Sequence, residues 1–263
     1  MCSGSGPTEH GDPHARRPVS PAKLFAVPSP QDPDPEPAAA SSDRPPAAGR
    51  SARLLAPPAL LFLLITWQVA VRGPLERADE RVGRAVAHPD QVSGGLADLG
   101  NIGVAVPVLA VVLAYVAWRA RRDGTDRWWL PPVAAAALMA AVPALIVPLK
   151  ELIARPGPPV MGPGTGFYPS GHTATAAVAY GAAALVLWPW LRTPYARRGV
   201  LVVCLVLNLA VAYGLVRHGY HWPLDVLASW CLCAVLLRAL RLLLSRSSRR
   251  TSAGTPSSRT GPS

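Results

Sequence analysis

Ionisable and small residues gather in three short segments of the second half of the chain. The segments read KELIARPGPP at 150–159, YPSGH at 168–172 and RHGYHWPLD at 217–225. In the third segment His221 and Asp225 are four residues apart, so a helical turn would place them on one face. There the carboxylate can fix the tautomer of the imidazole and raise its basicity, which suits nucleophilic or acid–base chemistry.

Six apolar runs surround these segments and predict membrane-spanning helices. Half of the 263 residues are hydrophobic, and the runs approach the ~20 residues that a helix needs to cross a bilayer core. The runs are Leu54–Val71, Ile102–Trp118, Trp128–Leu149, His172–Leu191, Val200–Val216 and Trp222–Leu243. The sequence therefore predicts an all-α integral membrane protein, a bundle of six transmembrane helices.

The arginines indicate how these predicted spans are oriented. They lie before the first span, after the second, after the fourth and after the sixth, which are all on one side of the membrane. They include Arg50, Arg53, Arg119, Arg121, Arg122, Arg127, Arg192, Arg197, Arg198, Arg246, Arg249 and Arg250. Because positively charged loops stay in the cytoplasm, we expect a multi-pass plasma-membrane protein with both termini cytoplasmic. The three ionisable segments then meet on the extracytoplasmic face.

The two ends of the chain differ in composition from the spanning domain, residues 53–243. Residues 1–52 are rich in Pro, Ser, Ala and charge and cannot bury enough apolar surface to offset the entropy of ordering. They are predicted to be a disordered cytoplasmic tail, and residues 244–263 a second, basic one. The net charge of +11 does not indicate nucleic acid, because the arginines flank apolar runs and accompany no base-stacking aromatics.

A short surface helix is predicted in the first outer loop, residues 72–101. Leu75, Ala78, Val82 and Val86 recur there at helical spacing, opposite a charged face. Such a helix can lie in the membrane interface. The alternative is a plain solvated connector.

The three ionisable segments, in this order, resemble the motifs of the type 2 phosphatidic acid phosphatase superfamily over about residues 100–240. Its members include lipid phosphate phosphatases, bacterial polyprenyl diphosphate phosphatases and vanadium haloperoxidases. The residues that carry the resemblance are Lys150, Pro169, Ser170, Gly171, His172, His221 and Asp225. Two family arginines are absent, because their places are taken by Gly157 and Leu215. Arg155 and Arg217 are the nearest substitutes.

The resemblance implies a metal-independent phosphatase without a cofactor. His221, oriented by Asp225, would attack phosphorus and form a phosphohistidine, while His172 would protonate the leaving oxygen and later activate water. The phosphate charge would be neutralised by cationic side chains and backbone N–H groups. These phosphate-binding residues are Lys150, Arg155, Ser170, Gly171 and Arg217.

A site at the membrane surface suits a substrate whose apolar tail stays in the bilayer. We expect a lipid phosphate as partner: phosphatidate, phosphatidylglycerophosphate, or a polyprenyl phosphate or diphosphate. Three alternatives stay open, namely a lipid phosphotransferase on the same fold, a catalytically silent membrane scaffold, and a metal-dependent hydrolase. In the last, His172 and His218 would complete a metal site with His221 and Asp225.

Overall fold

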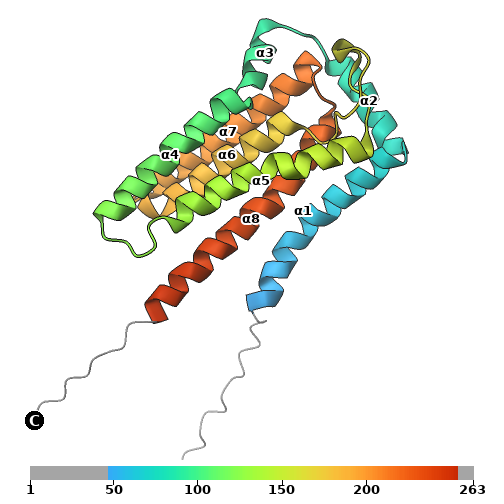
Figure 1. Cartoon of the computed structure of the whole chain (residues 1–263). Helices are drawn as coiled ribbons and strands as arrows, with labels where there is room; N and C mark the ends of the chain where they lie inside the picture. Colours follow the sequence, from blue (N-terminus) through green and yellow to red (C-terminus); the bar gives the residue numbers. More distant parts are fainter. Residues whose placement is uncertain (1–46, 254–263) are drawn as a thin grey trace, which may run out of the picture. The chain divides into compact units, whose positions relative to one another are not determined.

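The computed structural model describes residues 47–253, with side chains described for residues 55–246, and its regular elements in this range are helices (Figure 1). The eight α-helices are α1 (Ala47–Ala70), α2 (Pro74–Val86), α3 (Gln91–Asp98), α4 (Ile102–Arg122), α5 (Leu130–Ile153), α6 (Gly171–Leu187), α7 (Pro194–His218) and α8 (Pro223–Ala253). Two short 3-10 helices, Pro159–Met161 and Trp188–Trp190, lie in connections. The predicted all-α fold class is confirmed.

Within residues 47–253, five helices are long and apolar enough to cross a membrane. They are α4, α5, α6 with its 3-10 extension to Trp190, α7, and α8 as far as Arg246. The predicted first span, Leu54–Val71, corresponds to α1, which meets α2 at a bend of 85°. The number of spans reaches six only if this bent pair is one span. The chain is a multi-pass membrane protein in either case.

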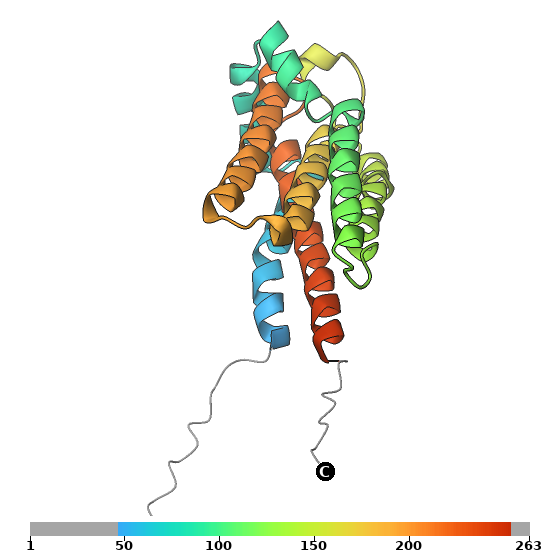
Figure 2. The same cartoon turned by 90° about the vertical axis from the view of Figure 1, so that its left-hand side faces the viewer.

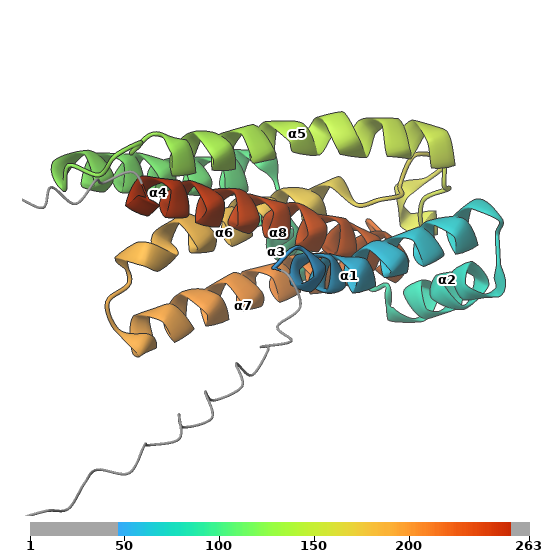
Figure 3. The ribbon, with the colours of Figure 1, turned by 90° about the horizontal axis from the view of Figure 1, so that it is seen from below.

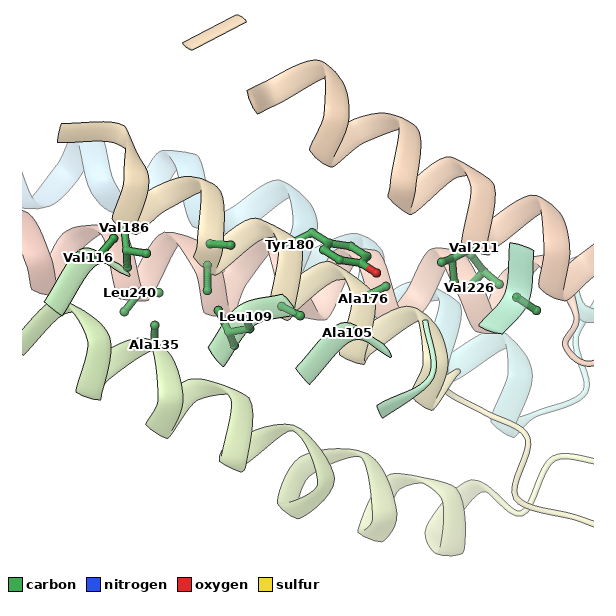
Figure 4. Close-up of a cluster of buried hydrophobic side chains, with 14 of the residues drawn as sticks. Ala105, Leu109, Val116, Ala135, Ala176, Tyr180, Val186, Val211, Val226 and Leu240 are labelled. Atoms are coloured by element: carbon green, nitrogen blue, oxygen red, sulfur yellow. The ribbon is translucent and has the colours of Figure 1, made fainter. Parts of the chain in front are cut away.

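Helix α6 is the central helix of the bundle. In its most apolar stretch 67% of the residues are buried, against 22% in α4, α5 and α7. Small side chains such as Ala176, Ala179 and Ala182 let the neighbouring helices approach closely. The core around them, drawn in Figure 4, takes side chains from α4, α5, α7 and α8, including Leu109, Ala135, Val211 and Leu240.

The bundle has two distinct ends. One end carries the connection between α5 and α6, the last turn of α7 and the first turn of α8 (Figure 3). The other end carries the α4–α5 and α6–α7 connections, and α1 begins and α8 finishes toward it (Figure 2). All three ionisable segments therefore lie at the first end, as predicted.

The predicted surface helix is present as α2, and its charged face points into the protein. Glu76, Asp79 and Gly83 are buried, while Leu75 and Val82 are 39% and 53% exposed. The apolar stripe is thus free to face lipid, in keeping with an interfacial helix. The reason for the inward polar face is an arginine described below.

Helix α3 was not predicted. It begins with a capping box, in which Asp90 accepts the backbone N–H of Ser93 at 2.7 Å. It packs closely on α7 at Gly214, where a Cβ would lie only 2.5 Å from the backbone nitrogen of Ala97. Helix α3 thereby covers the last turns of α7.

The predicted tails fall mainly outside the described residues. Residues 1–46 and 254–263 are not described. At the inner edges of the tails the helices continue, because α1 begins at Ala47 and α8 ends at Ala253.

Candidate active site

The α5–α6 connection delivers the first ionisable segment. Lys150 lies in the last turn of α5, and the helix ends at Ala154, whose φ of 46° is left-handed. This conformation turns the chain sharply after the helix. Tyr168, near the end of the connection, is fully buried and shares a hydrogen bond of 2.7 Å with Thr66 of α1. The α5–α6 connection is thus anchored to α1.

Arg155 follows the turn and is buried among carboxylates. Its Nη1 donates to Oδ1 of Asp225 at 2.5 Å, and its Nη2 donates to Oδ2 of Asp79 at 2.8 Å. Its Nε lies 3.6 Å from Oε1 of Glu76. The guanidinium also lies over the ring of Trp222, 5.7 Å from the centroid. Arg155 therefore joins α2, the α5–α6 connection and α8.

The charge of Arg155 is secured by these neighbours. Burial opposes the charged form, but the carboxylates of Asp225 and Asp79 raise the pKa of Arg155 above its ordinary value. Nη1 and Nη2 of Arg155 both donate to carboxylates, so the guanidinium holds Asp225 and Asp79 in this structure. Its predicted phosphate-binding role stays a prediction.

Asp225 holds His221 in place. Oδ2 of Asp225 lies 3.3 Å from Nδ1 of His221 and also accepts the backbone N–H of Trp222 at 3.1 Å. Asp225 lies in the first turn of α8 and His221 lies in the bend just before this helix, so the two residues meet at the predicted spacing of four although His221 is not itself helical. Because Nδ1 faces the carboxylate, Nε2 is the ring nitrogen left for a substrate.

The ring of His221 is covered by Phe167. Their centroids are 6.0 Å apart in an edge-on arrangement, and only 7% of His221 is exposed. Phe167 also fills the space beside Gly157, where a Cβ would lie 2.5 Å from the phenyl ring. A phenyl group therefore stands where one of the two family arginines would begin.

Ser170 joins the second ionisable segment to the third. Its N–H donates to the carbonyl of Asp225 at 3.1 Å, and its own carbonyl accepts the hydroxyl of Ser229 at 2.8 Å. Its side chain caps α6 by accepting from Thr173. The Ser170 N–H is therefore engaged, and the first free N–H groups of α6 among the described residues are those of Gly171 and His172.

Lys150 and His172 lie beside these N–H groups. Cε of Lys150 is 4.0 Å from the position that a Cβ of Gly171 would take. His172 follows Gly171 in α6 with an exposed side chain, and the bond from the Ser170 N–H to Asp225 brings the turn that carries His221 to the same place. The structure thus gathers Lys150, Gly171, His172 and His221 around one end of α6.

Arg217 is directed elsewhere. Its Nη1 donates to the carbonyl of Val86 at 3.2 Å, and its Nε lies 3.8 Å from Oδ2 of Asp90. These contacts attach α7 to the α2–α3 connection. The place of the other family arginine is held by Leu215, which is fully buried and accepts the N–H groups of Tyr220 and His221 through its carbonyl.

His218 does not join the two other histidines. Its Nδ1 lies 3.1 Å from both the hydroxyl of Ser93 and the carbonyl of Asp90. Within the described part of the chain, no group of three or more His, Cys, Asp or Glu is arranged to hold a metal ion.

Two residues of the site were not predicted. Asp79 and Glu76 belong to the charged face of α2 and bind Arg155, which lies more than 70 residues later in the chain. Their spacing of three signalled a shared helix face. It did not signal that this face is buried, because charged helix faces are usually solvated.

Comparisons with known proteins agree with the motifs. Residues 131–249 match the family model of the PAP2 superfamily. A solved structure, described as the first transmembrane PAP2 type phosphatidylglycerolphosphate phosphatase from Bacillus subtilis, has the same fold, with a TM-score of 0.60 and 24% sequence identity. The match covers 72% of this chain and 96% of that one. No curated protein sequence matches the chain significantly.

Proposed function

Because residues 131–249 match the family model of the PAP2 superfamily, we propose that the chain is a membrane phosphatase that hydrolyses a lipid-linked phosphate or diphosphate. The observation that carries the proposal is the arrangement of Lys150, Gly171 and His172 at the start of α6, to which the Ser170–Asp225 hydrogen bond brings His221, whose Nδ1 faces Asp225. These are the residue types that metal-independent phosphoryl transfer to histidine requires. They come from three segments far apart in the sequence.

In the proposed reaction, Nε2 of His221 attacks phosphorus and the bond from phosphorus to the leaving oxygen breaks. Protonated His172 gives its proton to that oxygen, and the alcohol or phosphate product departs. Neutral His172 then takes a proton from water, whose oxygen attacks phosphorus and breaks the P–N bond. Asp225 stabilises the positive charge that develops on His221.

We assign the binding of the negatively charged phosphate to Lys150 and to the N–H groups of Gly171 and His172. A helix N-terminus favours an anion through its free N–H groups and its dipole. Lys150 supplies the nearby full charge. Arg155 is assigned the task of holding Asp225, and Ser170 that of fixing the start of α6.

A lipid substrate fits the position of the site. The catalytic side chains lie at the ends of apolar helices, beside α2 with its outward apolar stripe. A lipid chain could then remain in the bilayer while its phosphate reaches His221. The arginines gathered at the opposite end of the bundle favour an extracytoplasmic site. Phosphatidate, phosphatidylglycerophosphate and polyprenyl phosphates are the substrates to be compared.

A silent scaffold is the second candidate, because of two observations. Gly157 and Leu215 provide no guanidinium. Gly157 is packed against the ring of Phe167, and Leu215 is fully buried. The arginine nearest to Gly157 in sequence, Arg155, is bound to carboxylates, and the arginine nearest to Leu215, Arg217, is bound to the α2–α3 connection. Among the described residues, Lys150 is then the one lysine or arginine left for the phosphate beside His221, and such a site would bind phosphate weakly or fail to turn it over.

One assay distinguishes these functions. The full chain, purified in detergent, is incubated with each lipid phosphate, with and without EDTA, and phosphate release is measured. The proposal expects EDTA-resistant release that His221→Ala abolishes and His218→Ala preserves, since His218 bonds to Ser93 and Asp90 instead. Absence of release from every lipid favours the scaffold, and transfer to an added alcohol instead of water identifies a phosphotransferase.

A further inference from the structure

A cavity of about 470 Å³ lies at the end of the bundle opposite His221. Its walls are mainly apolar and come from four helices, through residues such as Val116, Leu130, Leu185 and Leu244. Its polar residues, Thr125, Asp126 and Arg127 among them, belong to the α4–α5 connection. The volume falls in the range of ~300–1,000 Å³ typical of ligand sites. An apolar chain with a polar head would match this lining.

The segments around the cavity are strongly basic. Residues 119–127 and 192–198 together contain seven arginines and two aspartates. The arginines are Arg119, Arg121, Arg122, Arg127, Arg192, Arg197 and Arg198. One of the aspartates, Asp123, pairs with Arg119 at 3.4 Å. An excess of positive charge thus surrounds an apolar cavity.

Two tryptophans connect the charge to the cavity wall. Trp128 and Trp190 both line the cavity. The guanidinium of Arg121 lies 4.7 Å from the ring centroid of Trp128, and that of Arg119 lies 6.0 Å from the ring centroid of Trp190. Tryptophan prefers the headgroup level of a bilayer, where an arginine on its face meets lipid phosphates.

We propose that this cavity binds an anionic phospholipid from the leaflet opposite the His221 site. Its acyl chain would lie among Val116, Leu130 and Leu185, and its phosphate would meet the arginines beside Trp128 and Trp190. Arginines that only orient the protein require neither a cavity nor tryptophans on its wall. The site is independent of the proposed phosphatase activity, because it shares no residue with it.

The test uses a photoreactive anionic phospholipid with a diazirine on its acyl chain, added to the full chain in detergent. After illumination, labelled peptides are identified by mass spectrometry. Labelling is expected within residues 116–131 and 185–190, and excess unlabelled anionic phospholipid should abolish it. Phosphatidylcholine and inorganic phosphate should compete about tenfold less well. Equal competition by phosphatidylcholine would overturn the charge preference, and competition by inorganic phosphate would indicate a simple anion site.

Two substitutions test the location. Leu130→Trp fills the cavity and should lower labelling about tenfold, whereas Val133→Trp, on a side chain that is 53% exposed on the same helix, should leave it unchanged. If Leu130→Trp does not purify as a folded protein, Arg119→Gln with Arg121→Gln replaces it and should remove the preference for anionic lipid. Even labelling of the exposed faces of α4 and α7, unaffected by these changes, would refute the site.

Discussion

The carboxylate of Asp79 on α2 accepts the backbone N–H of Leu224 at 2.9 Å and so ties α2 to the first turn of α8. The other oxygen of Asp79 binds Arg155, which in turn binds Asp225. Asp79 thus fixes, from two sides, the helical turn on which the proposed nucleophile is oriented. Among the described residues, no hydrogen bond or ion pair joins Asp79 to His221 or to Lys150, so its influence on catalysis would be one of position.

Asp79→Asn should lower kcat more than it changes KM. The asparagine oxygen can still accept the N–H of Leu224, but its NH2 group would face a guanidinium donor, so Arg155 and Asp225 would shift. A displacement of about 1 Å in a catalytic group can cost about 10²-fold in rate. Steady-state kinetics with the best lipid substrate measures this. Glu80→Gln, on the partly exposed side of the same helix, is the matched control and should behave like the wild type.

His172→Ala should separate the two halves of the reaction. An aryl phosphate has a leaving group that needs no proton, so phosphorylation of His221 should remain fast, while the water step loses its base. Phosphohistidine should then accumulate, and turnover should fall by about 10²–10⁴-fold. Phosphate from ³²P-labelled substrate, trapped on the protein under alkaline conditions, reports it. Failure of label to appear, with turnover intact, would exclude His172 as the base.

Gly214→Ala should destabilise the protein through the contact between α3 and α7. Its Cβ would lie 2.5 Å from the nitrogen of Ala97 and 2.7 Å from the carbonyl oxygen of Ser93, which are backbone atoms that cannot rotate away. Such overpacking costs about 1–3 kcal/mol, and the midpoint of thermal unfolding in detergent should fall. Gly95→Ala is the control, because a Cβ there meets nothing within 4 Å. It should keep or raise the midpoint, since alanine favours a helix.

The cap of α3 should make its docking sensitive to acid. Hydrogen bonds from Ser93 lower the pKa of Asp90 below its ordinary value. A lowered pKa in the folded state means that the stabilisation is present above the ordinary pKa and is lost as the pH falls through the folded value. Hydrogen exchange of α3 should therefore speed up in acid. In Asp90→Asn, which keeps the cap and loses the titration, this part of the pH dependence should disappear.

The sequence predicted those features that depend on local periodicity. The apolar runs located five spans and α1, and their alternating direction brought Lys150, His172 and His221 to one end of the bundle. The spacing of His221 and Asp225 predicted their contact. These inferences need only helix geometry and bilayer thickness.

The long-range partners of the site could not be predicted in this way. Nothing in the spacing of Glu76 and Asp79 indicates an arginine in the α5–α6 connection. The engagement of the Ser170 N–H by Asp225 likewise depends on how α6 packs against α8. Helix α3 was not predicted because it is only eight residues long and its packing depends on Gly214 of α7.

Arg155→Lys decides between the two roles of this arginine. If Arg155 holds Asp225, a lysine cannot reproduce the separate bonds from Nη1 and Nη2 to two carboxylates. In that case kcat should fall by about 10²-fold with little change in KM. The double variant with Asp79→Asn should then cost little more than either change alone, because both break the same network. If Arg155 binds phosphate instead, KM should rise, and the effect of Asp79→Asn should add to it. Kinetics of the two single variants and the double variant give the answer, with Arg81→Lys as the control because the exposed side chain of Arg81 bonds to the carbonyl of Arg77 on the same helix.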